Sequence, residues 1–125
     1  MSNLDSSLPS ERIKIIAIMG SDQDMSTAIP TIGKQLSSDF GGVFISQGQG
    51  YWSSIGNKVT DHYPSDTILE EQSLKIELLI LPSQKELALK KLRDAISNAN
   101  NKHKLDCRFI HVEISESLAA HIDLD

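Results

Sequence analysis

The loop from Gly20 to Asp24 carries polar side chains in a setting that could bind a ligand. Its sequence is Gly-Ser-Asp-Gln-Asp, and it joins an apolar run, expected to be a buried strand, to an expected helix. Backbone N–H groups and the positive end of a helix converge at such a junction, which favours anions such as phosphate. The candidate ligand-binding residues of this loop are Gly20, Ser21, Asp22 and Asp24. The alternative is that one of the two aspartates simply caps the helix.

A second candidate region begins at two glycines that precede two aromatic residues. Gly48 and Gly50 permit backbone conformations closed to other residues, so we expect the strand to bulge or turn there and count both as ligand-binding candidates. Tyr51 and Trp52 are candidate partner-binding residues because large amphipathic rings are favoured at interfaces, although Trp52 could instead belong to the core. The course of the chain from 47 to 72 is the least determined, and residues 58–62 are expected to pair back as a strand.

Basic residues near the end of the second expected helix complete the ligand candidates. Lys102 and Lys104 could meet an anionic ligand, or they could be the solvated end of a helix whose dipole favours cations. Of the histidines, only His111 shows a possible ligand spacing, since it would share a strand face with Glu113. That pair alone does not predict a metal site, and no cofactor is predicted.

No complete catalytic motif is present in the sequence. It contains no Gly-x-Ser-x-Gly turn, no phosphate-binding P-loop and no cysteine–histidine pairing, so no catalytic residue is assigned. Whether the protein is an enzyme is left open, and a non-enzymatic role is favoured.

Composition places the chain among globular proteins of one domain. It has 125 residues, 39% of them hydrophobic, and a formal net charge of -5 with scattered lysines, which disfavours nucleic-acid binding. Residues 1–12 are expected to be a loose tail, and residues 13–125 a single α/β domain. The apolar runs are too short for a membrane span, and the single cysteine, Cys107, is expected to be a buried residue of a strand, so the cytoplasm is the expected compartment.

Hydrophobic periodicity predicts the order strand, helix, strand, strand, helix, strand. Strands are expected at 13–19, 43–46, 74–81 and 108–114, and the first of them should be buried on both faces. The first helix should begin near Ala28 and end at Gly41, whereas the second should begin with a capping box of Ser83 and Glu86. Ser115 could cap a short final helix.

This order predicts an α+β, ferredoxin-like βαββαβ fold with a four-stranded sheet and both helices on one face. The other face then needs a cover that a third long helix does not provide. We therefore expect a homo-oligomer, a dimer or trimer that packs sheet faces or edges together.

Residues 13–41 resemble the opening of carboxyaminoimidazole ribonucleotide mutase, in which a Gly-Ser-Asp-x-Asp loop holds the phosphoribosyl part of the substrate. The resemblance implies a sugar-phosphate site at Gly20, Ser21, Asp22 and Asp24. The next element of that family, a strand ending in Ser-Ala-His-Arg-Thr-Pro, is replaced here by a strand that ends at Ile45 to Gly48. Because the catalytic histidine is missing, that activity is not expected.

Residues 43–114 resemble the second half of the signal-transduction PII and CutA group. The resemblance rests on the glycines and aromatics from Gly48 to Trp52, a variable loop, Glu71, the strand from Lys75 to Ile80 and a capped helix. It implies a trimer of ferredoxin-like subunits, a target-binding loop after the glycines and a nucleotide between subunits. PII proteins carry Gly-Asp-Gly after the second helix, where this chain has Lys102 to Asp106.

Three functional hypotheses follow. The first is a non-enzymatic, homo-oligomeric regulatory protein that binds an anionic or nucleotide-like molecule between subunits and contacts partners through the 48–71 loop. The second is a sugar-phosphate-binding enzyme that uses the Gly20 to Asp24 loop. The third is an acidic inhibitor protein that displays Tyr51 and Trp52 to a basic partner, because a net charge of -5 would steer it there.

Overall fold

The protein is a two-layer α+β domain. The structure is a computed structural model that describes residues 9–107 and 110–125. Its long elements are β1 (Ser10–Ser21), α2 (Ala28–Phe40), β2 (Phe44–Ser53), β3 (Ile68–Ile80), α3 (Lys85–His103) and β4 (Ile110–Ala119). Two short 3-10 helices, η1 (Ser65–Thr67) and η2 (Pro82–Gln84), precede β3 and α3.

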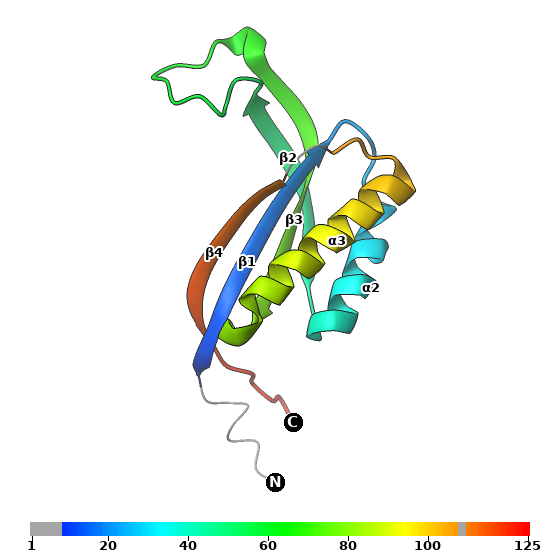
Figure 1. Ribbon diagram of the computed structural model, residues 1–125, viewed down its shortest axis with the longest axis vertical. Coiled ribbons are helices and arrows are strands. Elements are labelled where there is room, and N and C mark those ends of the chain that lie inside the picture. Colours follow the sequence, from blue (N-terminus) through cyan, green and yellow to red (C-terminus); the bar gives the residue numbers. More distant parts are fainter. Residues whose placement is uncertain (1–8, 108–109) are drawn as a thin grey trace.

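The four strands form one antiparallel sheet in the order β2-β3-β1-β4, and both helices lie on the same face of it (Figure 1). The predicted ferredoxin-like fold is therefore confirmed. Among the helices of the described residues, none combines the length and the apolar character that a membrane span requires.

The first helix, α2, begins and ends where its sequence predicts. Ala28, Ile32 and Leu36 recur every four residues and are fully buried, so they form one stripe against the sheet. Gly41 ends the helix with a left-handed φ of 84°, and its N–H donates to Ser37 O at 2.8 Å. Glycine is the residue that adopts this conformation without strain.

The start of α3 differs from the prediction. Pro82 begins the 3-10 turn η2, so the α-helix starts only at Lys85 and Ser83 does not occupy the N-cap position. The predicted capping box of Ser83 and Glu86 is therefore wrong. Instead, Leu81 N–H donates to the Gln84 side-chain oxygen at 3.0 Å.

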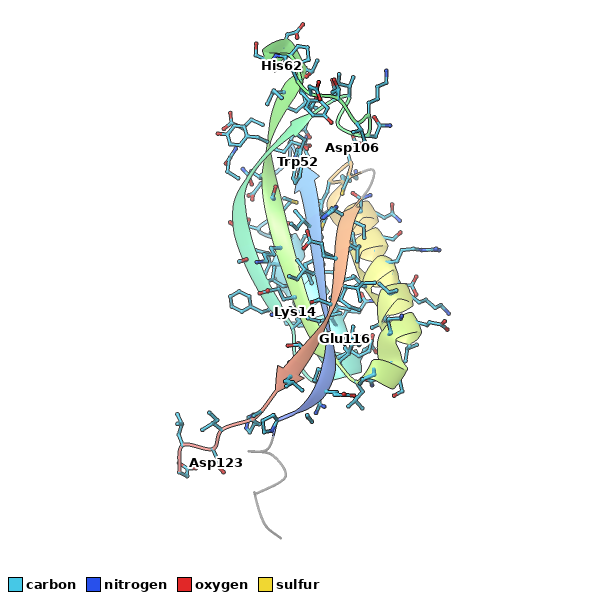
Figure 2. The ribbon with its side chains drawn as sticks, turned by 90° about the vertical axis from the view of Figure 1, so that its left-hand side faces the viewer. Lys14, Trp52, His62, Asp106, Glu116 and Asp123 are labelled. Carbon is cyan, nitrogen blue, oxygen red and sulfur yellow. The ribbon has the colours of Figure 1, made fainter. Side chains whose placement is uncertain are left out.

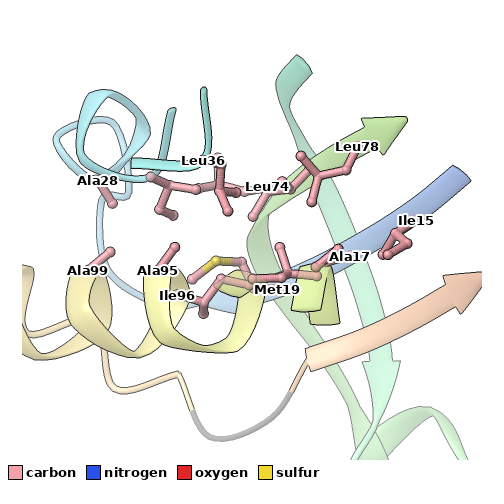
Figure 3. Packing of buried hydrophobic residues seen from close by; sticks show 14 of the residues in the cluster. Ile15, Ala17, Met19, Ala28, Leu36, Leu74, Leu78, Ala95, Ile96 and Ala99 are labelled. Carbon is pink, nitrogen blue, oxygen red and sulfur yellow. The ribbon is translucent and has the colours of Figure 1, made fainter. Parts of the chain in front are cut away.

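The core lies between the helices and the sheet (Figure 3). Alternate residues of β1 point into it, namely Ile15, Ala17 and Met19, each with no exposed surface. The buried stripe of α3 consists of Ala88, Leu92, Ala95, Ile96 and Ala99. The expectation that β1 is buried on both faces is not met within one chain, because Ile16 and Ile18 point away from the helices and are only partly buried.

All four strands are longer than predicted. β1 begins at Ser10, inside the expected tail of residues 1–12, because its start pairs with the end of β4; residues 1–8 lie outside the described part of the chain. β2 runs on to Ser53 in unbroken register with β3, so the bulge expected at Gly48 and Gly50 is wrong. Neither glycine has a positive φ.

The end of the chain was also predicted incorrectly. β4 continues to Ala119 because β1 offers it a partner as far as Ser10, so the short helix expected after Ser115 does not form. Residues 108–109, the expected start of this strand, lie outside the described residues. Cys107 lies in the loop before β4 rather than in a strand, partly buried against the core.

β2 and β3 extend beyond the rest of the sheet as a two-stranded arm, residues 50–71 (Figure 1). β1 stops pairing with β3 at Ser21 and Gln72, whereas β2 and β3 stay paired out to Ser53 and Ile68. Residues 58–62, expected to form a strand, are part of the loop at the arm tip. That loop has its own hydrogen bonds, including Ser54 N–H to Thr67 O at 2.7 Å.

Candidate functional site

A cleft at the base of the arm brings together two of the predicted ligand regions. It has a volume of about 640 Å³ and lies between the loop after β1 and the paired strands β2 and β3. Its lining residues are Asp24, Met25, Gln47, Gly48, Gln49, Gln72, Ser73 and Leu74. Asp24 and Gly48 were predicted from separate segments, and the antiparallel pairing of β2 with β3 beside the end of β1 makes them neighbours.

Asp24 supplies a carboxylate to this cleft. It accepts hydrogen bonds from the Ser26 backbone N–H at 2.9 Å and from the Ser26 hydroxyl at 3.0 Å. These bonds, the backbone one foremost, lower the pKa of Asp24, so its negative charge is present at neutral pH. The helix N-cap is Thr27 rather than Asp22 or Asp24, so the aspartate orders the loop as a local turn instead of capping the helix.

Three glutamine amides supply the other polar groups of the cleft. Gln47, Gln49 and Gln72 come from β2 and β3, and all three are exposed. Each amide offers both a donor and an acceptor. The amide nitrogen of Gln49 already donates to Glu70 Oε1 at 2.9 Å, which leaves Gln47 and Gln72 as the two amides without a hydrogen bond among the described residues.

The pairing of β2 with β3 places Trp52 on the opposite face of the same strands, and Figure 2 shows it near the end of β1. A Cβ atom at Gly50 would lie 2.8 and 2.9 Å from carbon atoms of the Trp52 ring and would overlap the Ser73 hydroxyl. The indole therefore lies flat across Gly50, and the absence of a side chain there is what admits it. A Cβ at Gly20 would lie 3.0 Å from Glu71 Oε1 and 3.4 Å from Trp52 Nε1.

Ser73 lies beneath this indole with an unsatisfied hydroxyl. The residue is 8% exposed, and its Oγ is buried without a hydrogen-bond partner in the described part of the chain. Such a group costs free energy unless something satisfies it. Its backbone also borders the cleft on the other side of the sheet.

The hydroxyl of Ser21, in contrast, is used inside the fold. It donates to the backbone oxygen of Leu105 at 2.5 Å and accepts from the Gln23 N–H at 3.0 Å. Asp22 Oδ1 accepts from the Gln23 side chain at 3.1 Å. Because these polar groups bind one another, the loop offers little that favours a sugar phosphate.

The Ser21 bond also fixes the loop after α3 to the end of β1. Lys102 lies in the last turn of α3, and Lys104 ends the helix in a left-handed conformation with φ 53°. Both side chains are exposed. Figure 2 shows Asp106, which closely follows these lysines in the sequence, near the level of Trp52. The lysines are thus at the same end of the domain as the cleft, although neither lines it.

Tyr51 and Trp52 do not form one patch. Successive residues of a strand point to opposite faces, so Tyr51 faces the helix side and Trp52 the other side. Tyr51 is 62% exposed and Trp52 37% exposed, which excludes the core for Trp52 within a single chain.

The histidine–carboxylate pair expected on β4 is present. His111 Nε2 lies 2.9 Å from Glu113 Oε2, and both side chains are exposed. Within residues 9–107 and 110–125, no group of three or more potential ligands gathers in one place. The pair thus remains a surface contact.

Neither a protein-family model nor a curated protein matches this sequence. The geometry of the site therefore carries the functional inference.

The sequence did not single out Ser73, Gln47 or Gln72. The available signal was the alternation along β2. Once the strand is extended, Gly48, Gly50 and Trp52 lie on one of its faces, so Gln47 and Gln49 lie on the other. The expected bulge hid this, because it ended the strand before the residues that line the cleft.

Proposed function

We propose that the protein is a non-enzymatic, homo-oligomeric ligand-binding or regulatory protein that holds a polar small molecule at the base of its arm. The observation that carries the proposal is the cleft of about 640 Å³ beside Asp24 and Gly48. Ligand pockets in proteins commonly measure roughly 300–1,000 Å³ and carry a few polar groups that orient the ligand.

The lining favours a particular ligand chemistry. Asp24 contributes a negative charge, Gln47 and Gln72 contribute amides, and the lining residues of the described chain include no lysine or arginine. The part of the ligand inside the cleft should therefore be neutral or cationic and rich in hydrogen-bonding groups. An anionic or nucleotide-like ligand would have to direct its charge outward to Lys102 and Lys104.

The arm and the uncovered sheet face support the regulatory and oligomeric parts of the proposal. The arm follows Gly48 and Gly50 in the sequence, as the target-binding loop follows the glycines in the PII group, whose second half residues 43–114 resemble. Phe44 and Leu79 are 62% and 44% exposed on the face without helices, and exposed apolar residues of this size indicate an interface. A monomer of 13.8 kDa at micromolar concentration in light scattering would contradict the oligomer.

The fluorescence of Trp52, the single tryptophan, provides a direct test of ligand binding. We suggest titrating the protein with an adenine nucleotide, a neutral amide and a polyamine, and measuring emission and melting temperature. At a hundredfold excess over its Kd, a ligand should raise the melting temperature by about 5 °C or more. No response in either signal to any compound would contradict ligand binding.

Two glutamine variants locate the site. Gln47→Ala should weaken binding at least about tenfold, since each lost hydrogen bond to a ligand contributes roughly 0.5–1.5 kcal/mol and the packing against the amide is lost with it. Gln35→Ala, on α2 and outside the cleft lining, is the control and should leave affinity unchanged. Equal losses in both variants would place the ligand elsewhere.

A second candidate function, binding of a basic partner by the arm, is favoured by the surface of the arm. The arm carries acidic residues and exposed apolar ones such as Tyr51 and Leu69. Its carboxylates are Asp61, Asp66, Glu70 and Glu71, against the single cation Lys58. A lysine-rich peptide should bind at low salt, and Glu70→Gln with Glu71→Gln should weaken it; salt-insensitive or absent binding would exclude this function.

A further inference from the structure

The face of the sheet opposite the helices, here called the open face, carries charges and apolar groups in adjacent rows. Rows run across the strands, because paired residues of neighbouring strands point to the same side. One row consists of Phe44, Glu77, Ile16 and Glu113. The next row consists of Ser46, Lys75, Ile18 and His111.

Each of the two ion pairs on this face has one member in each row. Lys75 Nζ lies 3.7 Å from Glu77 Oε1, and His111 Nε2 lies 2.9 Å from Glu113 Oε2. On β1, Ile16 and Ile18 lie between these pairs and are only partly buried. The pattern of one row thus complements that of the next in both charge and apolar character.

We propose that a second copy of the chain covers the open face, related by a two-fold axis that runs between these rows and perpendicular to the strands. Such an axis exchanges the two rows. Lys75 then faces the partner's Glu77, Glu77 faces the partner's Lys75, and Ile16 faces the partner's Ile18. A two-fold interface requires a surface that complements itself in this manner.

The rows on either side of the axis complement each other in size. Leu79, which is 44% exposed, is paired with Lys14 in the row below. The axis places this row opposite the one formed by Gly48, Ser73 and Gly20. The partner's Leu79 then lies opposite Ser73 and the Trp52 indole above it, and Gly48, where a Cβ would meet no atom within 4 Å, leaves room beside that ring. The partner's Lys14 is then close to Glu71, which borders Gly20.

The balance of charge on the open face favours a copy of the same chain over a strongly charged partner. The strands place three cations there, Arg12, Lys14 and Lys75, and three carboxylates, Glu71, Glu77 and Glu113. The whole chain has a net charge of -5, so its excess of acidic groups lies elsewhere. Two open faces can therefore approach without net repulsion, at the spacing of about 10 Å that stacked sheets adopt.

This inference names the partner and the contacts of the homo-oligomer in the proposed function, and it rests on that function. Charge reversal followed by mixing tests it. Lys75→Glu and Glu77→Lys should each place like charges opposite one another twice per dimer, which should weaken association at least about tenfold. An equimolar mixture of the two variants should regain the dimer, because every facing pair then has opposite signs.

Light scattering should give twice the chain mass of 13.8 kDa for the wild type and for the mixture, but not for either variant alone. A dimer regained on mixing cannot result from a restored ion pair within one chain, since each chain keeps its own substitution. Lys90→Glu on the exposed side of α3 makes the same charge change and should leave the mass unchanged. Circular dichroism establishes that each variant is folded.

If a single variant fails to fold, the double variant Lys75→Glu with Glu77→Lys serves instead. It keeps an attractive pair within the chain, so it should form its own dimer but should not exchange subunits with the wild type. A monomeric wild type, single variants that stay dimeric, or free exchange of the double variant would overturn the interface. A trimer would overturn it while leaving the proposed homo-oligomer, and ligand titration of Lys75→Glu reports separately on the cleft.

Discussion

Two serines with buried side chains differ in what their hydroxyl groups bind. Ser21 donates to the backbone oxygen of Leu105, 84 residues away, whereas Ser73 Oγ is buried under Trp52 without a partner in the described chain. The first hydroxyl connects the end of β1 to the loop after α3. The second opposes folding unless something satisfies it.

Replacing each serine with alanine should therefore have opposite effects. Ser21→Ala leaves a buried carbonyl unsatisfied and should lower the free energy of unfolding by about 1–3 kcal/mol. Ser73→Ala removes an unsatisfied group and should be neutral or stabilising by about 1 kcal/mol. Urea unfolding measures both, and a clear destabilisation by Ser73→Ala would mean that its hydroxyl does have a partner.

Asp24 should make stability depend on pH. Hydrogen bonds from Ser26 lower its pKa in the folded state, so the folded protein binds this proton less readily than the unfolded chain does. The contribution of Asp24 to the free energy of unfolding is complete above the ordinary aspartate pKa of about 3.9. It is lost as the pH falls through the lower pKa of the folded state. Urea unfolding between pH 5 and pH 2 should show a smaller loss for Asp24→Asn than for the wild type.

The matched control for Asp24 is Ser26→Ala. It removes the hydroxyl donor but keeps the backbone N–H, which is the larger cause of the lowered pKa. Its pH dependence should therefore resemble that of the wild type more than that of Asp24→Asn. If the free energy of unfolding falls equally with pH in the wild type and in Asp24→Asn, this carboxylate does not contribute to the pH dependence of stability.

At the scale of elements, the arm is separable from the core. None of the buried core residues of the described chain belongs to residues 50–71, and the arm is held by strand pairing and by its own bonds, such as Ser53 Oγ to Thr67 Oγ1 at 2.8 Å. The tip of the arm should therefore be removable without unfolding the domain.

Replacing residues 54–67 with Asn-Gly tests this independence. Ser53 and Ile68 are directly paired, so a two-residue turn can join them. The melting temperature should stay within about 5 °C of the wild type, the shift that roughly 1 kcal/mol produces in a domain of this size. Loss of cooperative melting would show instead that the tip of the arm stabilises the sheet.

The order of the elements could be predicted from the sequence because the spacing of apolar residues reflects which side of each helix or strand is buried. Ile32 and Leu36 mark the helix stripe, and Gly41 marks its end, so α2 was predicted closely. Strand ends were not, since pairing in a sheet depends on the partner strand: β1 reaches Ser10 only because β4 extends to Ala119. No local signal carries that information.

The candidate site was predicted only in part for the same reason. Asp24 and Gly48 stood out locally, but their meeting in one cleft depends on the register of β2 with β3. A glycine in a strand predicts backbone freedom, whereas Gly50 has no positive φ and provides space for an indole. Local sequence cannot distinguish these two uses of glycine.

At the scale of the whole molecule, folding should be coupled to association. Ile16 and Ile18 occupy the centre of a sheet face that no helix of the described chain covers, and the exposed Phe44 lies in the same row as Ile16, on the far side of Glu77. Their burial is complete only when another molecule lies on that face. Anything that binds the folded chain but not the unfolded chain stabilises the folded state by mass action, and the stabilisation by a second copy grows with the logarithm of its concentration.

The melting temperature should therefore rise with protein concentration. For a dimer of this chain length, each tenfold increase should raise it by about 3 °C, given an unfolding enthalpy of about 0.7 kcal/mol per residue. Lys75→Glu associates more weakly, so it should melt at a lower temperature than the wild type at each concentration. Calorimetry from 5 to 500 μM, about two decades, measures this. A wild-type melting temperature that does not change over this range would mean that Ile16, Ile18 and Phe44 face water in the native protein, and the domain would then have to be stable on one core alone.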